Sequence, residues 1–240
     1  MVRILRIFRE LTSSENDEID ALLNARSSDH VVTSRFNIPI RLCVLHRLKD
    51  GGWLNDEIIN YYVELLKESN PSDDHHHSYY FYQTYFYAKL RGSDGNFCYE
   101  NVQRWNKDVN VFCFKKIFVP LHVHGDHWAL AVIDMANKTI CYIDSLKSND
   151  DTFRGLEILN MWLYREAQRV GVSESFDNFN LVSLECPQQD NCSDCGIFLL
   201  TFMHLMHLNE DINLMEQSLA NFMRRKVALS LMRGILQVSY

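Results

Sequence analysis

The sequence predicts an α+β fold in which helices flank a small, central mixed sheet. The sheet is indicated by three consecutive segments that are rich in β-branched and aromatic residues and are separated by turn residues, namely 117–123, 127–134 and 139–144. Helices are indicated by apolar residues at helical spacing before and after these segments. Of the 240 residues, 47% are hydrophobic, which is enough to build the core of one domain. We therefore expect residues 1–240 to form a single domain, with residues 1–50 as its helical and extended N-terminal part.

The charge and the cysteine content argue against several classes of protein. The formal net charge is −7 and the basic residues are scattered along the chain, so we expect no nucleic-acid partner. No apolar run approaches the length that spans a membrane, and charges interrupt the N-terminus too often for a signal peptide. We therefore expect a soluble, unsecreted protein with no membrane partner. Seven cysteines without paired spacing indicate a reducing compartment.

The first part of the chain is predicted to contain two helices with an extended segment between them. The first helix is expected from about Ser14 to Ala25, with Ser13 or Ser14 as its cap. Residues 31–42 are β-branched and interrupted by a proline, which is typical of short edge strands or an extended arm. Asn55 is expected to cap the second helix, whose apolar residues should face the core. These apolar residues are Ile58, Tyr62, Leu65 and Leu66.

The middle of the chain is interpreted as a polar loop followed by aromatic core. Residues 70–78 contain three adjacent histidines and lack periodicity, which is more typical of a solvated loop than of a metal site. Residues 79–82 are expected to form a short strand and residues 85–91 a helix, because both are too aromatic for a surface. A loop at 92–96 and a second short helix at 99–105 should follow.

The last part of the chain is predicted to be mainly helical. A long amphipathic helix from about 151 to 170 should end before a glycine. One more strand is expected at 179–184. A helix from 195 to about 207 and another from 215 to roughly 237 should close the chain. The buried stripe of the long helix is predicted to consist of Leu156, Leu159, Trp162, Leu163 and Ala167.

A polar loop at 187–194 turns into an apolar helix that begins at Cys195. The first turn of a helix carries unpaired amide donors and the positive end of the macrodipole, and both stabilise a thiolate. Cys195 is therefore the candidate nucleophile, although most free cysteines are simply small buried residues. Cys192 and Cys195 also form a C-x-x-C pair. A redox pair would need a βαβ context, and a zinc site would need a second pair of ligands, so we expect no metal.

His127 begins one predicted strand and Asp144 ends the next, so the pair offers a base and a group that orients it. If residues 135–138 connect these strands, the hairpin pairs residue i with residue 273 − i, which puts Asp144 opposite Ala129. Because side chains alternate between the faces of a strand, His127 and Asp144 then share one face, roughly 7–8 Å apart at the backbone. A slip of one residue would break this arrangement. Taken alone, each residue is also explained as a core or sheet-edge histidine and a turn aspartate.

The oxyanion formed in acyl transfer needs a neutral donor near the nucleophile. Gln189 lies six residues before Cys195, and its side-chain amide would not neutralise the thiolate. The backbone amide of Cys195 offers a second donor. Gln188 is an equally good candidate on chemical grounds, and spacing does not choose between the two glutamines.

These motifs resemble the signature of the SUMO-specific cysteine proteases, the Ulp/SENP family, within the adenoviral-protease-like peptidases. The resemblance covers the chain from about residue 10 to its end and implies a papain-like cysteine protease architecture. The order His, Asp, Gln, Cys is itself informative, because papain-like enzymes place the cysteine first. The segments that carry the resemblance are His127-Trp128, Asp144-Ser145, the run from Gln189 to Gly196, and residues 53–60, 102–105 and 117–122.

The resemblance implies a role for each catalytic position. Cys195 would attack the carbonyl of a Gly-Gly terminus, and His127 would hold the thiolate as an ion pair and then protonate the leaving amine. Asp144 would orient the imidazole ring. Gln189, rather than Gln188, would donate to the oxyanion. The implied activity is hydrolysis of isopeptide bonds, and of precursor peptide bonds, after the Gly-Gly of SUMO, without a cofactor.

The resemblance also implies how the substrate is bound. Trp53 and Trp128 are similar to two tryptophans that bracket a narrow channel for the glycine tail, and such a channel would select Gly-Gly sterically. Asp56 resembles a position that contacts a basic residue on the modifier. The implied partners are SUMO and SUMO-conjugated proteins, and we expect a monomer that is nuclear or nucleocytoplasmic.

Cys192 departs from the family, which often has glycine at this position. A side chain there could crowd the loop, and a second thiol stands close in sequence to the candidate nucleophile. We therefore expect oxidation to join Cys192 and Cys195 in a disulfide.

Two alternative functions stay open. One is cleavage of another ubiquitin-like modifier, because the triad and channel read only the tail. The other is a non-catalytic modifier-binding module, which the filled catalytic positions argue against.

Overall fold

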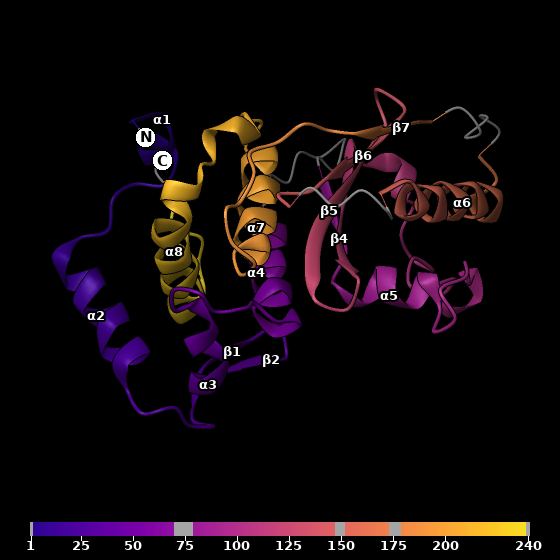
Figure 1. Cartoon of the computed structure of the whole chain (residues 1–240). Coiled ribbons are helices and arrows are strands. Elements are labelled where there is room, and N and C mark those ends of the chain that lie inside the picture. Colours follow the sequence, from indigo (N-terminus) through magenta and orange to yellow (C-terminus); the bar gives the residue numbers. More distant parts are fainter. Residues whose placement is uncertain (1, 70–78, 147–151, 173–178, 239–240) are drawn as a thin grey trace. The chain divides into compact units, whose positions relative to one another are not determined.

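The computed structural model describes residues 2–69, 79–146, 152–172 and 179–238 (Figure 1). The chain divides into two compact units, one of residues 1–69 and 187–240 and the other of residues 70–186. The expected single domain therefore stays a prediction. The histidine tract at 75–77 lies outside the described residues.

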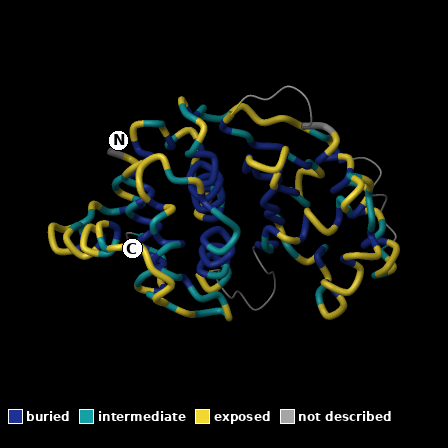
Figure 2. Tube along the Cα trace, turned by 60° about the horizontal axis from the view of Figure 1, so that its bottom comes forward, coloured by how far each residue is buried: buried dark blue, intermediate teal, exposed yellow. Residues whose placement is uncertain are grey.

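The first unit is mostly helical, and its helices α4, α7 and α8 pack against one another (Figure 1). A two-stranded antiparallel sheet, β1 with β2, confirms the short strands expected between residues 31 and 42. Burial is deepest along α7, where every residue except Met206 is buried (Figure 2). The elements are α1 (Val2–Ile7), α2 (Ser13–Asn24), β1 (Val31–Arg35), β2 (Ile38–Arg41), α3 (Leu42–Leu45), α4 (Asp56–Glu68), α7 (Cys195–His207) and α8 (Ala220–Arg233).

The caps of α2 and α4 explain where these helices begin. The predicted caps of α2, Ser13 or Ser14, are wrong, because Thr12 caps this helix and forms a capping box with Glu15. Each of the two residues satisfies a backbone N–H of the other, so the helix begins at the residue after Thr12. Asn55 caps α4 as predicted.

The helix predicted at residues 215–237 is shorter in the structure, where α8 covers Ala220–Arg233. Single 3₁₀ turns at Ile212–Leu214 and Gln217–Leu219 occupy the preceding residues. Gly234 has a left-handed backbone with φ of 65°, which ends the helix.

The second unit is built around a five-stranded mixed sheet in the order β3-β4-β5-β6-β7 (Figure 1). The three central strands are antiparallel, and both edge strands pair parallel to their neighbours. Helices α5 and α6 pack against this sheet, so the predicted α+β class with a small mixed sheet is confirmed. The elements are β3 (Tyr79–Phe81), α5 (Tyr85–Arg91), β4 (Lys116–Val123), β5 (His127–Asp134), β6 (Thr139–Ile143), α6 (Thr152–Val170) and β7 (Asn180–Ser183).

Most of the predicted elements of this unit are present. The predicted stripe of α6 is buried in one core with the strands. The helix expected at 99–105 is wrong, because only Tyr99–Asn101 form a 3₁₀ turn, and further turns follow it. The backbone N–H of Trp105 reaches only three residues back, to Val102, so no α-helical ladder forms there. Within the described residues, no helix is long and apolar enough to cross a membrane.

Candidate active site

His127 and Asp144 meet on one face of the central sheet. His127 is the first residue of β5, and Asp144 follows the last residue of β6. Leu130 pairs with Ile143, which is the predicted register in which paired residue numbers sum to 273. The His127 Nε2 atom lies 2.7 Å from Asp144 Oδ1, and the two side chains are 9% and 8% exposed. Because an ionised carboxylate only accepts hydrogen bonds, the ring donates from Nε2, and acid–base chemistry at this histidine falls to Nδ1.

The Asp144 carboxylate is held in place by the residues on both sides of it. Its Oδ1 atom also accepts from the backbone N–H of Leu146 at 2.8 Å, and its Oδ2 atom accepts from the Tyr142 hydroxyl at 3.1 Å. The Asp144 carbonyl accepts from the Cys186 thiol at 3.0 Å. Both carboxylate oxygens are thus fixed, and so is the orientation of the imidazole that they hold.

Trp128 follows His127 in β5, so its side chain projects from the opposite face of the sheet. It is buried and packs against His122, which is its partner across the strand pair, with ring centroids 4.4 Å apart. The contact with His122 fixes the plane of the Trp128 indole ring, next in sequence to His127.

Cys195 occupies the first position of α7, where the sequence places it, and its side chain is buried. The carbonyl of Asp194 accepts from the backbone N–H groups of Ile197 and Phe198 and so begins the helix. A thiolate at this position lies at the positive end of a 13-residue helix.

The loop before Cys195 is folded by its own polar side chains. The Asn191 Oδ1 atom accepts from the backbone N–H groups of Ser193 and Asp194, at 2.9 and 3.1 Å. Gln189 is buried, and its Nε2 atom donates to the carbonyl of Asn191 at 2.5 Å. This bond fixes the plane of the Gln189 amide, whereas Gln188 is only half-buried.

The two substrate-binding candidates of the first unit lie at the start of α4. Trp53 precedes this helix and is 43% exposed, and its carbonyl accepts from the Arg47 guanidinium at 3.1 Å. Asp56 is the first residue of the helix and is half-buried.

Family comparison decides what this set of residues belongs to. The catalytic C-terminal domain of the Ulp1 protease family matches residues 52–235. The chain belongs to the Ulp1 protease family. The matched range contains all seven of the candidate site residues, from Trp53 to Cys195.

Curated relatives and a solved structure agree with this family. Sentrin-specific protease 2 of Homo sapiens is 32% identical over 222 residues, which are 91% of this chain and 36% of that protein. Ubiquitin-like-specific protease 1 of Saccharomyces cerevisiae is 32% identical over 200 residues, 81% of this chain and 30% of that protein. The chain thus spans about a third of the length of these relatives. The C-terminal Ulp1 protease domain, solved in complex with Smt3, the yeast ortholog of SUMO, has a TM-score of 0.82 at 28% identity and covers 94% of this chain and 97% of that one.

Sequence reasoning missed three polar residues in this member of the Ulp1 family, namely Tyr142, Asp194 and Arg224. The contact of Tyr142 with Asp144 could have been predicted, because Tyr142 lies two residues before Asp144 and therefore on the same face of the strand. Asp194 and Arg224 form a buried ion pair that no spacing rule indicates. Burial is the largest influence on the pKa of Asp194 and raises it, but hydrogen bonds from Asn191, Gln217 and Arg224 together hold that pKa below its ordinary value.

Cys192 and Cys195 differ in exposure, since the first thiol is exposed and the second is buried. The disulfide between them stays a prediction. Peptide mapping after peroxide treatment should find the crosslink, and Cys192→Ser should then lose activity by a different course. Equal inactivation of both proteins without a crosslink would rule it out.

Among the described residues, no group of three His, Cys, Asp or Glu side chains is arranged to hold a metal ion.

Proposed function

We propose that this protein is a cysteine peptidase that hydrolyses the isopeptide bond, and the precursor peptide bond, after the C-terminal Gly-Gly of SUMO. The observation that carries the proposal is the 2.7 Å hydrogen bond between His127 and Asp144, in a chain that belongs to the Ulp1 protease family. The likeness to a Ulp1 domain that was solved with Smt3 supports SUMO as the modifier. The first position of α7, occupied by Cys195, supports the cysteine as the nucleophile.

In the acylation step, the Cys195 thiolate attacks the carbonyl carbon of the terminal glycine. The charge that develops on the carbonyl oxygen is stabilised by the backbone N–H of Cys195 and by the side-chain amide of Gln189. An amide nitrogen carries two N–H groups, and the one that bonds to Asn191 fixes the plane in which the other donates. His127 then gives its Nδ1 proton to the leaving amine, and a thioester is left on Cys195.

In the deacylation step, His127 accepts a proton from water as the water attacks the thioester carbonyl. The second tetrahedral intermediate collapses with cleavage of its C–S bond, and the thiolate with its imidazolium is restored. The modifier leaves as the carboxylic acid, which gives its proton to the solvent. Asp144 stabilises the imidazolium in both steps and keeps the ring in the tautomer that needs Nδ1 for proton transfer.

Selection of the Gly-Gly tail is assigned to Trp53 and Trp128, whose indole rings would leave room only for residues without a side chain. Asp56 is assigned to a basic residue of the modifier, at the acidic first turn of α4. The partners are then SUMO and its conjugates, bound by a monomeric protein in the nucleus or nucleocytoplasm. These assignments rest on the family resemblance.

The proposal is tested with a panel of ubiquitin-like proteins that end in a C-terminal electrophile. We expect the SUMO probe to label the wild-type protein and not Cys195→Ala. Labelling by a different modifier would identify that modifier as the substrate instead of SUMO. Labelling by none would favour a non-catalytic binding module. Gln189→Ala should lower kcat by about 10²–10³-fold, with Gln188→Ala as its matched control close to the wild-type rate.

A further inference from the structure

Arg224 is a buried arginine whose hydrogen bonds join two loops that are far apart in the sequence. The first is the nucleophile loop, residues 189–194, and the second is the tryptophan loop, residues 47–53. The Arg224 side chain is 1% exposed, and it projects from α8. Its bonds run from Nε to Asp194 Oδ1 at 2.9 Å, from Nη2 to Asp194 Oδ1 at 2.5 Å, to Ser193 O at 3.0 Å and to Gly52 O at 2.8 Å, and from Nη1 to Lys49 O at 2.9 Å and to Arg47 O at 3.2 Å.

A guanidinium has three nitrogen atoms that donate in a rigid, planar fork, and all three are used here. Each nitrogen of Arg224 meets an oxygen of one loop or the other, and Nη2 meets both. The distance between the two loops is therefore set by the width of one side chain. A lysine retains the charge but not the fork.

The residues that follow the two loops also touch directly. A Cβ atom added to Gly196 would lie 2.8 Å from the Cβ atom of Leu54, so the start of α7 lies against the residue that follows Trp53. Gly52 is equally constrained, because an added Cβ would overlap the carbonyl of Arg47. Close approach is thus built into the tryptophan loop, at Gly52, and into the start of α7, at Gly196.

Gln217 fastens the nucleophile loop from the turn that precedes α8. Its Oε1 atom accepts from the backbone N–H of Asp190 at 3.1 Å, and its Nε2 atom donates to Asp194 Oδ2 at 2.7 Å. Together with Arg224, it occupies both oxygens of the Asp194 carboxylate. The residue before Cys195 is consequently fixed from two sides.

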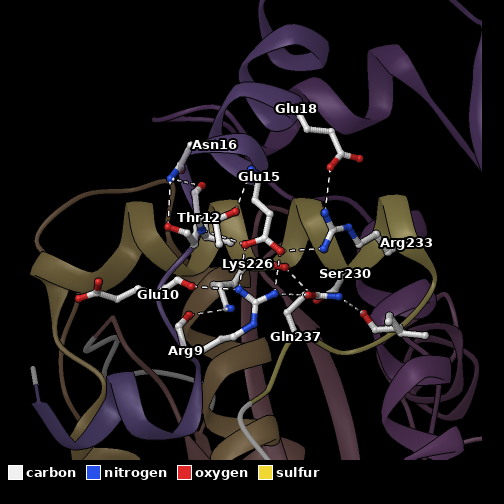
Figure 3. Close-up of polar contacts among 12 residues, drawn as sticks. Arg9, Glu10, Thr12, Glu15, Asn16, Glu18, Lys226, Ser230, Arg233 and Gln237 are labelled. Carbon is white, nitrogen blue, oxygen red and sulfur yellow. Dashed lines mark hydrogen bonds and ion pairs between the residues drawn. The ribbon is translucent and has the colours of Figure 1, made fainter.

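A general role in stability does not explain this arrangement. A buried ion pair is on average no more stabilising than apolar residues of the same volume, because desolvation offsets the Coulomb attraction. The fold already has a second polar cluster on α8, the Glu15 cluster of Glu15, Arg9 and Arg233, which ties α2 to α8 (Figure 3). Its bonds run to Thr12, Glu18 and Gln237, which belong to neither the nucleophile loop nor the tryptophan loop.

We propose that Arg224 is a positioning residue, which sets the geometry between the start of α7, with Cys195, and the loop that ends at Trp53. The inference rests on the proposed function, because it assigns the attack to Cys195 and the glycine channel to Trp53. Arg224 touches no reacting atom and acts through the backbone of the two loops. A displacement of about 1 Å in such a site lowers the rate by about 10²-fold.

The test compares Arg224→Lys with Arg225→Lys, its neighbour on α8, which bonds to Asp20 and Asn16 instead. The substrates are SUMO fluorogenic amides that end in Gly-Gly or in Ala-Gly. We expect kcat of Arg224→Lys on Gly-Gly to fall by about 10²-fold and KM to change by less than about threefold, since no group that contacts substrate is lost. The preference for Gly-Gly over Ala-Gly should weaken, and the pH profile of Cys195 alkylation by iodoacetamide should stay unchanged.

Each outcome decides between this inference and its alternatives. A folded Arg224→Lys with the kcat and tail preference of Arg225→Lys overturns it, and so does a shifted alkylation profile, which would make the effect electrostatic. If Arg224→Lys does not fold, Gln217→Leu takes its place, since it removes two bonds to the same loop from a half-buried position. A Gln217→Leu protein with unchanged kcat and tail preference then overturns the inference. Failure of the proposed function is seen separately, as a wild-type protein that cleaves neither amide.

Discussion

Two carboxylates, Glu15 and Asp194, are held by arginines against α8. We assign the first to the stability of the fold and the second to the geometry of the proposed site. Hydrogen bonds from Arg9 are the main reason that the pKa of Glu15 lies well below its ordinary value. The pKa of Asp194 is lowered as well, against a larger opposing effect of burial. Both clusters pair a carboxylate with arginine, but they join different segments and differ in exposure.

The Glu15 cluster reaches solvent, and the Asp194–Arg224 pair does not. The side chains of Arg9 and Arg233 are 38% and 36% exposed, so water replaces part of any bond that is lost. Arg224 and Asp194 are almost completely buried, and removal of either one strands the charge of the other. Disruption of the pair next to Cys195 should therefore lower the free energy of unfolding more than disruption of the Glu15 cluster.

The sharpest separation of fold from site comes from the variants Arg224→Met, Asp194→Leu and their combination. Each single variant leaves a buried, unpaired charge, and we expect the free energy of unfolding to fall by about 3–5 kcal/mol. The double variant should regain part of this loss, because no charge is stranded, although loop carbonyls lose their donor. Its kcat should stay low. Urea unfolding and steady-state kinetics measure the two quantities, and a double variant with wild-type kcat would erase the distinction between the clusters.

Gly196→Ala tests the direct contact between the start of α7 and Leu54, the residue after the tryptophan loop. The added Cβ would meet the Leu54 Cβ at 2.8 Å, and neither atom rotates away, so the start of α7 must shift. Overpacking of this kind costs about 1–3 kcal/mol, and we expect kcat to fall with it. Gly155→Ala in α6 is the matched control, because its nearest atom, the Tyr87 hydroxyl oxygen, lies 3.4 Å away and alanine favours a helix. Equal effects of both variants on kcat would count against the contact.

Glu15→Gln probes the cluster that we assign to the fold. The amide keeps one oxygen for Arg9 or Arg233 and loses the charge, so the free energy of unfolding should fall by about 1–2 kcal/mol. The kcat and the preference for Gly-Gly over Ala-Gly should equal those of the wild type. A changed tail preference in this variant would show that α8 transmits any disturbance to the loops, and that Arg224 is not special.

The sequence predicts the local parts of the site and misses the long-range ones. The contact of His127 with Asp144 follows from a turn of known length and the alternation of side chains, both of which act over a few residues. The position of Cys195 follows from the change between a polar loop and an apolar run. The Thr12 cap was also readable, because Thr12 and Glu15 have the spacing of a capping box.

Arg224 could not be found in this way. It stands in the run Arg224-Arg225-Lys226, and three adjacent cations on a helix are typical of a solvated face. In the structure Arg224 and Lys226 are buried and Arg225 lies between them at the surface side. The partners of Arg224, at positions 47–52 and 193–194, come from segments that only the tertiary fold brings together. Helix propensity and hydrophobic periodicity therefore carry no information about them.

The smallest effect that we predict is an acid sensitivity of the first unit. Its source is a pair of histidines that belong to neither cluster. Lowered carboxylate pKa values add stability that is lost only as the pH falls through the values of the folded state, below about 4. Two histidines near the end of α7 behave differently. Burial lowers the pKa of His204 to about 3 and that of His207 to about 4. The unfolded chain therefore takes up protons first as the pH falls through about 6.5, and stability declines.

Between pH 7 and 6 the free energy of unfolding should fall by about 0.7 kcal/mol for each histidine, and more steeply toward pH 5. The combined variant His204→Leu with Tyr62→Phe removes both partners of the 2.7 Å bond between the His204 Nδ1 atom and the Tyr62 hydroxyl, so no polar atom of that pair is stranded. Urea unfolding at pH 7, 6 and 5 should give it about half of the wild-type slope. If the slope is unchanged, the acid sensitivity between pH 7 and 5 does not come from His204, because the lowered carboxylate pKa values of the two clusters act only at lower pH.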